Sequence, residues 1–256
     1  CHSNYHAFQG SFSHRFQDGL QFQVNYTWST AFDNNSESVY SLGNTSPFAS
    51  DYYNLDYDRG YAAFDVTQVF SGNFIYELPF GPGKWLGGDS EGWLAQLIGG
   101  WQVNGIVTAN TGYPLDYKVA RDTLGTGYTN NRGPARPNVT TYEFSTDATN
   151  NIMGPTAANF SFASSVINLR SPQGDYYRGK FRGPGYWNMD FSLFKDVKLP
   201  WFTAEGSRLQ FRAEAFNLFN HTNYGNPNTT LTSVNLGKSF TARANRQIQF
   251  GLKFIF

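Results

Sequence analysis

The fold is decided by the closing stretch of the chain, which reads Arg246-Gln247-Ile248-Gln249-Phe250-Gly251-Leu252-Lys253-Phe254-Ile255-Phe256. Every second side chain from Ile248 to Phe256 is apolar, whereas the positions between them, from Gln247 to Lys253, carry polar side chains or glycine. A period of two places alternate side chains on opposite faces, so this stretch is predicted to be a β-strand. A strand of about ten residues with one apolar face is typical of an outer-membrane barrel. An edge strand of a soluble sandwich shows the same alternation, so the rest of the chain has to decide.

The same alternation returns in six further stretches of the chain. They are residues 5–16, 20–29, 62–78, 99–110, 187–195 and 209–215. The first two are joined by Asp18-Gly19, a dipeptide that supplies the positive φ of a tight hairpin turn. Residues 90–98 instead have weak helical spacing. The sequence therefore predicts seven antiparallel strands, and residues 113–119 could extend the fourth strand or begin an eighth.

The connections between these strands alternate strictly in length. Long polar loops are expected at about 30–60, 111–185 and 221–244, and short turns at about 17–19, 79–92 and 200–206. Outer-membrane barrels have long extracellular loops and short periplasmic turns, so this alternation favours a barrel wall over a sandwich. Single-chain bacterial barrels have an even number of strands, and about eight is the useful minimum. We therefore expect all 256 residues to be the carboxy-terminal part of one larger barrel.

Composition excludes several other classes of protein. Aromatic residues make up 18% of the chain, charged residues 15%, and the net charge is zero, which argues against nucleic-acid binding. No apolar run is long enough for a transmembrane helix, and no signal peptide is visible. The single cysteine, Cys1, allows no internal disulfide. It is either a lipid-bearing first residue or, as we expect, a point partway into a longer protein.

No motif predicts catalysis. None of the four histidines lies in a nucleophile motif, and Gly125-Thr126-Gly127 lacks the Gly-Lys that a phosphate-binding loop requires. We therefore expect neither enzyme activity nor a cofactor. Asp51, Asp56 and Asp58 are weak calcium candidates, because their oxygen atoms suit the ion but their spacing matches no known calcium loop.

The strand faces predict two further groups of residues. The polar faces are expected to line the barrel lumen and to form a mainly structural charge ladder; these residues are Asp190, Arg212, Glu214 and Lys253. Aromatic side chains suit the girdles at the two membrane interfaces; the candidates are Tyr26, Trp28, Tyr76, Trp101, Trp187 and Trp201. Lys195 lies on an apolar face, where its amine must reach toward an interface.

Several stretches resemble the end of the Oar-like TonB-dependent receptors of Gram-negative bacteria. They are residues 99–105 (Gly-Gly-Trp-Gln-Val-Asn-Gly), 112–114 (Gly-Tyr-Pro), 182–195, 211–223 and the closing strand. The resemblance implies a barrel of about twenty-two strands around an internal plug, often preceded by a carboxypeptidase-regulatory-like domain. Neither a plug nor an energy-coupling box is found in these residues.

The resemblance also implies partners. They are outer-membrane lipid, the barrel assembly machinery, the inner-membrane energy-coupling complex acting through an upstream region, and a large cargo such as a siderophore, glycan or peptide. Phe256 resembles the aromatic carboxy-terminal signal that the assembly machinery recognises, and the closing strand is expected to pair with a first strand outside this chain. The alternative is an adhesive or self-assembling β-protein at the cell surface, without transport.

Overall fold

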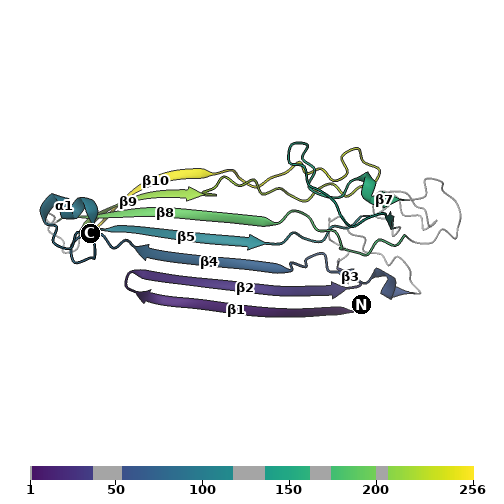
Figure 1. Cartoon of the computed structure of the whole chain (residues 1–256), viewed down its shortest axis with the longest axis horizontal. Helices are drawn as coiled ribbons and strands as arrows, with labels where there is room; N and C mark the ends of the chain where they lie inside the picture. The colour runs from purple at the N-terminus through teal and green to yellow at the C-terminus, as the bar shows by residue number, and fades with distance from the viewer. Residues whose placement is uncertain (1, 37–53, 118–135, 162–173, 200–206) are drawn as a thin grey trace.

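The structure, a computed structural model, describes residues 2–36, 54–117, 136–161, 174–199 and 207–256. They form one long antiparallel sheet in which each wall strand pairs with the next along the chain (Figure 1). The wall strands are β1 (Ser3–Gln17), β2 (Leu20–Asp33), β4 (Gln68–Glu77), β5 (Trp101–Asn110), β8 (Tyr186–Lys198), β9 (Arg208–Phe216) and β10 (Gln247–Ile255). The predicted all-β antiparallel fold with seven wall strands is thus confirmed. The sheet does not close, because β1 and β10 lie at opposite edges.

The third strand is shorter than the alternation predicted. It begins at Gln68 rather than at residue 62. Before it, β3 (Gly60–Tyr61) pairs with the end of β2, and the amide of Ala62 donates to the carbonyl of Ala31. The cause is Asp65, whose carboxylate is buried and accepts a hydrogen bond from the backbone amide of Ala31 at 2.6 Å. An extended strand through this position would break that contact.

The long connection between β5 and β8 adds no wall strand within the described residues. Residues 113–117 form a single bridge, from Pro114 to Arg182, instead of a ladder. The two short strands β6 (Asn138–Val139) and β7 (Phe160–Ser161) pair only with each other. The extra strand considered for residues 113–119 is therefore absent from the part of that range that is described.

The register separates the sheet into an apolar and a polar face. Phe250 lies opposite Ala213, which lies opposite Leu193, and all three are on one face. The neighbouring row, Gln249, Glu214 and Ser192, is on the other. Large apolar side chains of the first face remain uncovered, with Phe250 71% exposed. Such a face is unfavourable in water and favourable against hydrocarbon.

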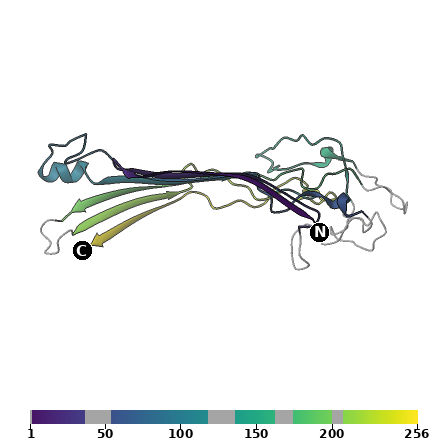
Figure 2. The ribbon, with the colours of Figure 1, turned by 90° about the horizontal axis from the view of Figure 1, so that it is seen from below.

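The two ends of the sheet differ (Figures 1 and 2). One end has the connections between β1 and β2, β4 and β5, and β8 and β9, and it carries the helix α1 (Gly92–Ile98). We call it the short-turn end. The other end carries the long connections, with the short helices η1 (Leu55–Asp58) and η2 (Ala157–Asn159). Figure 2 shows β8, β9 and β10 curving out of the plane of the other strands at the short-turn end. None of the helices described is long and apolar enough to cross a membrane.

Candidate functional site

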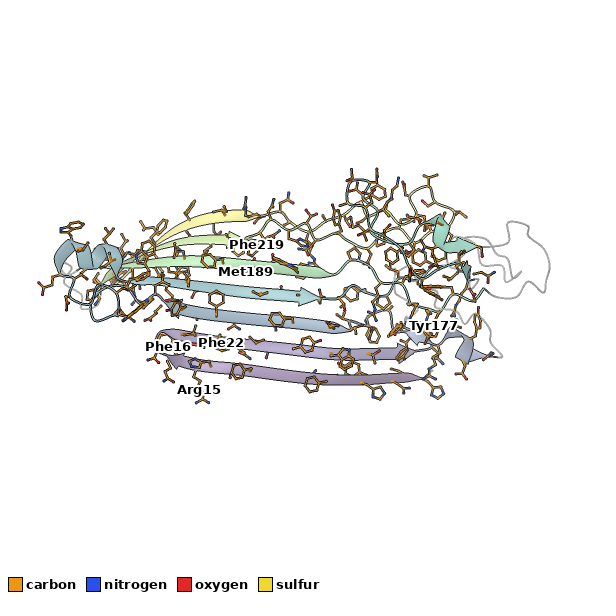
Figure 3. All side chains as sticks on the ribbon, viewed as in Figure 1. Arg15, Phe16, Phe22, Tyr177, Met189 and Phe219 are labelled. Atoms are coloured by element: carbon orange, nitrogen blue, oxygen red, sulfur yellow. The ribbon has the colours of Figure 1, made fainter. Side chains whose placement is uncertain are left out.

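The long connections form a folded unit that we call the loop cap, comprising residues 54–67, 111–117, 136–161, 174–185 and 217–246. Its centre is a cluster of buried apolar side chains: Leu115, Tyr117, Phe160, Tyr176, Phe181, Leu231 and Leu236. The rings pack closely, with 4.7 Å between the centroids of Tyr117 and Phe160 and 5.9 Å between those of Tyr176 and Phe181. Figure 3 shows side chains crowded at this end, where Tyr177 is labelled. Aromatic packing of this kind gives the loop cap its own hydrophobic core.

The two most deeply buried tyrosines of this core differ in their hydrogen bonds. The hydroxyl of Tyr176 donates to the backbone carbonyl of Leu115. The hydroxyl of Tyr117 is buried and has no hydrogen-bond partner. Burial raises the pKa of both phenols, so both remain protonated and uncharged at neutral pH. Their role is packing rather than proton transfer.

Three Arg–Asp ion pairs join the connection between β5 and β8 to the end of β2 and the segment that follows it. They are Arg136–Asp58, Arg178–Asp33 and Arg182–Asp65. In the first pair the guanidinium nitrogen is 2.5 Å from the carboxylate oxygen, and both side chains are at most one-tenth exposed. In the third pair the carboxylate is 1% exposed. Removing one partner of a buried pair costs about 3–5 kcal/mol, so these contacts hold the two connections together.

Aromatic rings support two of these arginines. The guanidinium of Arg136 lies 4.5 Å from the ring centre of Tyr57 and donates to its backbone carbonyl at 2.8 Å. The hydroxyl of Tyr57 in turn donates to the carbonyl of Gly174. Arg182 lies 5.0 Å from the ring centre of Tyr61. Burial is the main cause of a raised pKa of Tyr57, which therefore stays neutral beside these charges.

The asparagine-rich stretch after β9 fixes the beginning of the next loop. The side chain of Asn223 donates to the carbonyl of Trp187 and accepts from its amide, both at 2.9 Å. Asn217 adopts a φ of 53° and exchanges two side-chain hydrogen bonds with the backbone of His221. Asparagine tolerates such a left-handed conformation better than most residues. These asparagines, part of the stretch that resembles the receptor family, therefore have a structural role here.

The predicted lumen residues share the polar face, but they do not form an ion-pair ladder. Among the described residues, Asp190 accepts hydrogen bonds from the amide of Asn217 and the side chain of Asn188. Arg212 donates to Gln210 at 2.7 Å, and Glu214 accepts from Gln249. Amide side chains thus satisfy these charges, and no salt bridge connects them in the described part. Lys253 lies on the same face, opposite Gln210.

The girdle candidates lie at two levels of the apolar face. Tyr26 and Trp187 share a row near the loop cap, and Trp28 lies two residues further along β2. Tyr76 and Trp101 lie near the short-turn end. Trp101 is opposite Lys195, and the eight residue steps from Trp187 to Lys195 span about 27 Å along the strand. Trp201 lies outside the described residues.

Two of the three calcium candidates, Asp56 and Asp58, lie in η1. Asp58 is engaged with Arg136, and Asp51 lies outside the described residues. Within the part of the chain that is described, no three acidic, histidine or cysteine side chains are grouped so as to hold a metal ion. The buried charge of Asp58 is neutralised by an arginine, which leaves this carboxylate no need of a cation.

Sequence reasoning missed the residues that build the loop cap. Arg136, Tyr117 and Tyr176 lie in loops, which carry no alternation to mark burial. Asp33 is the last residue of β2, and Asp65 lies in an alternating stretch that was expected to be a strand, so neither was marked as a contact of the loop cap. The one available signal was the presence of both arginines and aspartates in loops of a chain with only 15% charged residues.

A comparison with protein families matches residues 1–249 to the model of an outer membrane beta barrel domain. The chain belongs to this outer membrane beta-barrel family. Membership places the barrel domain in the outer membrane. Barrels of this class expose an apolar face to lipid and a polar face to the lumen, and the two faces of this sheet have that character. No curated protein and no solved structure matched the chain.

Proposed function

We propose that this barrel domain is part of an Oar-like TonB-dependent receptor and contributes the wall and external loops for uptake of a large substrate. The observation that carries this proposal is the loop cap. A barrel that served only as a passive wall would not require loops with a buried aromatic core and three buried ion pairs. Ordered external loops suit the capture of a siderophore, glycan or peptide. The domain itself has no catalytic role in this proposal.

The proposed orientation has the loop cap outside the cell and the short-turn end in the periplasm. The carboxy-terminus is then periplasmic, and Phe256, whose side chain is 84% exposed, is accessible to the barrel assembly machinery. Energy coupling to the inner membrane would act through an upstream region. This orientation follows the usual placement of long loops and short turns in outer-membrane barrels.

The lumen face also supports a barrel with internal contents. Ile106 is 54% exposed on this face, in a row with Asn73 and Asp190. Ile75 is 36% exposed in the next polar row. Apolar side chains that are exposed among polar ones suit contact with a folded plug better than contact with water alone.

Uptake by the native bacterium tests the proposal. We would delete the gene for the full-length protein and measure accumulation of radiolabelled ferric siderophores, oligosaccharides and peptides. One of these should accumulate in the parent, and accumulation should be lost both in the deletion strain and in a strain without the inner-membrane energy-coupling complex. Accumulation that depends on the protein but not on energy coupling would refute TonB-dependent transport.

The unpaired sheet edges favour a second candidate function, an adhesive or self-assembling surface protein. β1 and β10 are both edge strands in this structure, and edge strands can pair with other copies. Cysteines introduced by Gln9→Cys on β1 and Gln249→Cys on β10 distinguish the candidates. Disulfides between copies would favour self-assembly, whereas a monomer with no cross-link between copies would exclude it.

A further inference from the structure

The turn segment, residues 79–100 between β4 and β5, exposes an unusual number of large apolar side chains. Trp85 is 85% exposed and Trp93 is 77% exposed. Further exposed apolar side chains in the segment are Phe80, Leu86, Leu94 and Leu97. Figure 2 shows α1 beyond the end of the sheet. The strands β8, β9 and β10 curve toward the opposite side from α1.

Hydrogen bonds fix α1 to the wall by its polar side. The amine of Lys195 donates at 2.6 Å to the carbonyls of both Gln96 and Gly99 at the end of the helix. The backbone amide of Lys198 donates to the side chain of Gln96 at 3.1 Å, and the indole of Trp101 donates to the carbonyl of Leu97 at 3.0 Å. The lysine expected to reach toward an interface therefore binds the helix end, a position that suits a cation.

The opposite side of α1 is apolar and uncovered. Trp93 and Leu97 are four residues apart and lie on one helix face, and Leu94 borders it. The side that carries Gln96 is directed at β8, as its bonds to Lys195 and Lys198 show. The helix is thus held in one orientation, which presents its apolar face outward.

This apolar face continues the lipid-facing surface of the barrel. Trp101 lies opposite Lys195, which lies opposite Phe211, and Phe211 lies opposite Leu252 on the lipid-facing side. Trp101 also lines an apolar groove of about 420 Å³ in the turn segment. The other apolar side chains that line the groove are Phe80, Leu86, Leu97 and Ile98. The groove and the lipid-facing strands share Trp101, so one hydrophobic surface runs from the wall to the helix.

We propose that the turn segment is an interfacial membrane anchor, in which α1 lies in the plane of the phospholipid leaflet and the groove holds an acyl chain. Trp85 and Trp93 have amphipathic rings that suit the headgroup level. A helix with one apolar face can lie in the interface without spanning the bilayer. Contact with lipid follows from continuity with the barrel wall. The identity of the leaflet as the periplasmic one rests on the orientation proposed above.

Site-directed spin labelling of the full-length protein tests the anchor. The protein would be reconstituted in vesicles of phosphatidylethanolamine and phosphatidylglycerol, with Cys1→Ser removing the one cysteine of this chain. Labels would be placed by Leu97→Cys and Leu94→Cys in α1, by Phe250→Cys on the wall and by Val234→Cys in the loop cap, where the side chain is 91% exposed. Collisions with oxygen report lipid, and collisions with a water-soluble nickel chelate report water. Heat-modifiable migration in detergent gels selects folded variants, and the two helix positions guard against one failing to fold.

The expected result is that the α1 labels resemble Phe250, with high oxygen and low chelate accessibility, whereas Val234 shows the reverse. If the label at position 250 is in lipid but the α1 labels collide with the chelate, the proposed membrane anchor is refuted while the barrel wall is supported. Labels in α1 that neither reagent reaches would mean that a protein partner or second copy covers the helix, which also overturns the anchor. A chelate-accessible Phe250 would refute the barrel wall itself, and with it both proposals.

Discussion

Replacing Asp65 by asparagine should open the loop cap while leaving the wall intact. The Asp65 carboxylate is 1% exposed, accepts from the amide of Ala31 at 2.6 Å and pairs with Arg182. Asp65→Asn keeps an acceptor for the amide but removes the negative charge. The guanidinium of Arg182 then loses its ionic partner while its side chain is still only 24% exposed.

The magnitude follows from what the asparagine retains. Removing one partner of a buried pair costs about 3–5 kcal/mol. The hydrogen bond from the Ala31 amide survives in Asp65→Asn, and water reaches part of Arg182. We therefore expect the substitution to destabilise the loop cap by about 2–3 kcal/mol. Asp65→Ala also leaves the Ala31 amide unpaired, which adds about 1–3 kcal/mol. A neutral double variant, Asp65→Asn with Arg182→Gln, should recover part of the loss, with a coupling energy of about 1–3 kcal/mol.

Hydrogen exchange measured by mass spectrometry gives the free energy of local opening of the loop cap. The amides of Leu115 and Gly183, which bond to the carbonyls of Phe181 and Tyr113 at 2.8 and 2.9 Å, lie beside the ion pair. A loss of 2 kcal/mol corresponds to about 30-fold faster exchange when opening limits protection. Amides within the wall strands should keep their protection.

An exposed ion pair provides the matched control. Lys84 and Glu77 are 3.1 Å apart, and their side chains are 42% and 43% exposed. Glu77→Gln should change the free energy of local opening, as obtained from the exchange rates, by no more than about 0.5 kcal/mol, because exposed ion pairs contribute little. Unchanged protection of the Leu115 and Gly183 amides in Asp65→Asn, or an equal loss in Glu77→Gln, would contradict the assignment of a stabilising buried pair.

Five further substitutions test packing, close backbone approach and lipid contact. Tyr117→Phe removes a buried hydroxyl without a partner and should keep or raise the resistance of the loop cap to proteolysis, whereas Tyr176→Phe should lower its stability by about 1 kcal/mol; equal behaviour would refute the distinction. Gly112→Ala places a Cβ against the backbone carbonyl oxygen of Gly183 in the same connection, so it should make the loop cap susceptible to protease, and full resistance would argue against that contact. Phe250→Arg on the lipid face should destabilise refolding into vesicles by about 2–4 kcal/mol, whereas Gln249→Arg in the lumen should be tolerated; the reverse order would exchange the two faces.

The wall was predictable because each of its strands is in contact with two different environments. Lipid on one side and a polar lumen on the other impose a period of two, which remains visible in a single strand such as β10. The pattern misled only where a loop happened to continue it. The apolar residues Phe64 and Val66 extended the alternation of β4 backwards, and nothing local showed that Asp65 between them would be buried against Arg182.

The loop cap was not predictable in the same way, because its contacts are remote in sequence. Tyr176 and Leu115 are 61 residues apart, and Arg182 and Asp65 are 117 apart. Neither contact is marked by a turn motif or a period. The family-like asparagines could be recognised as a pattern, but their role as caps of the chain after β9 became apparent only from the bonds that Asn217 and Asn223 make.

The loop cap buries its large apolar side chains, whereas the turn segment exposes them, and this difference indicates that the two regions contact different environments. In the described residues, the hydrophobic core cluster lies in the loop cap, whose rings pack on one another as in a water-soluble domain. The wall leaves its apolar side chains uncovered because lipid replaces a protein partner. The turn segment resembles the wall and not the loop cap, because Trp85 and Trp93 remain exposed. The polar groups at the end of α1, in contrast, are satisfied by hydrogen bonds. If the turn segment were in water, we would expect Trp85 and Trp93 to be buried. Phe181 in the loop cap is buried in this way and is only 2% exposed.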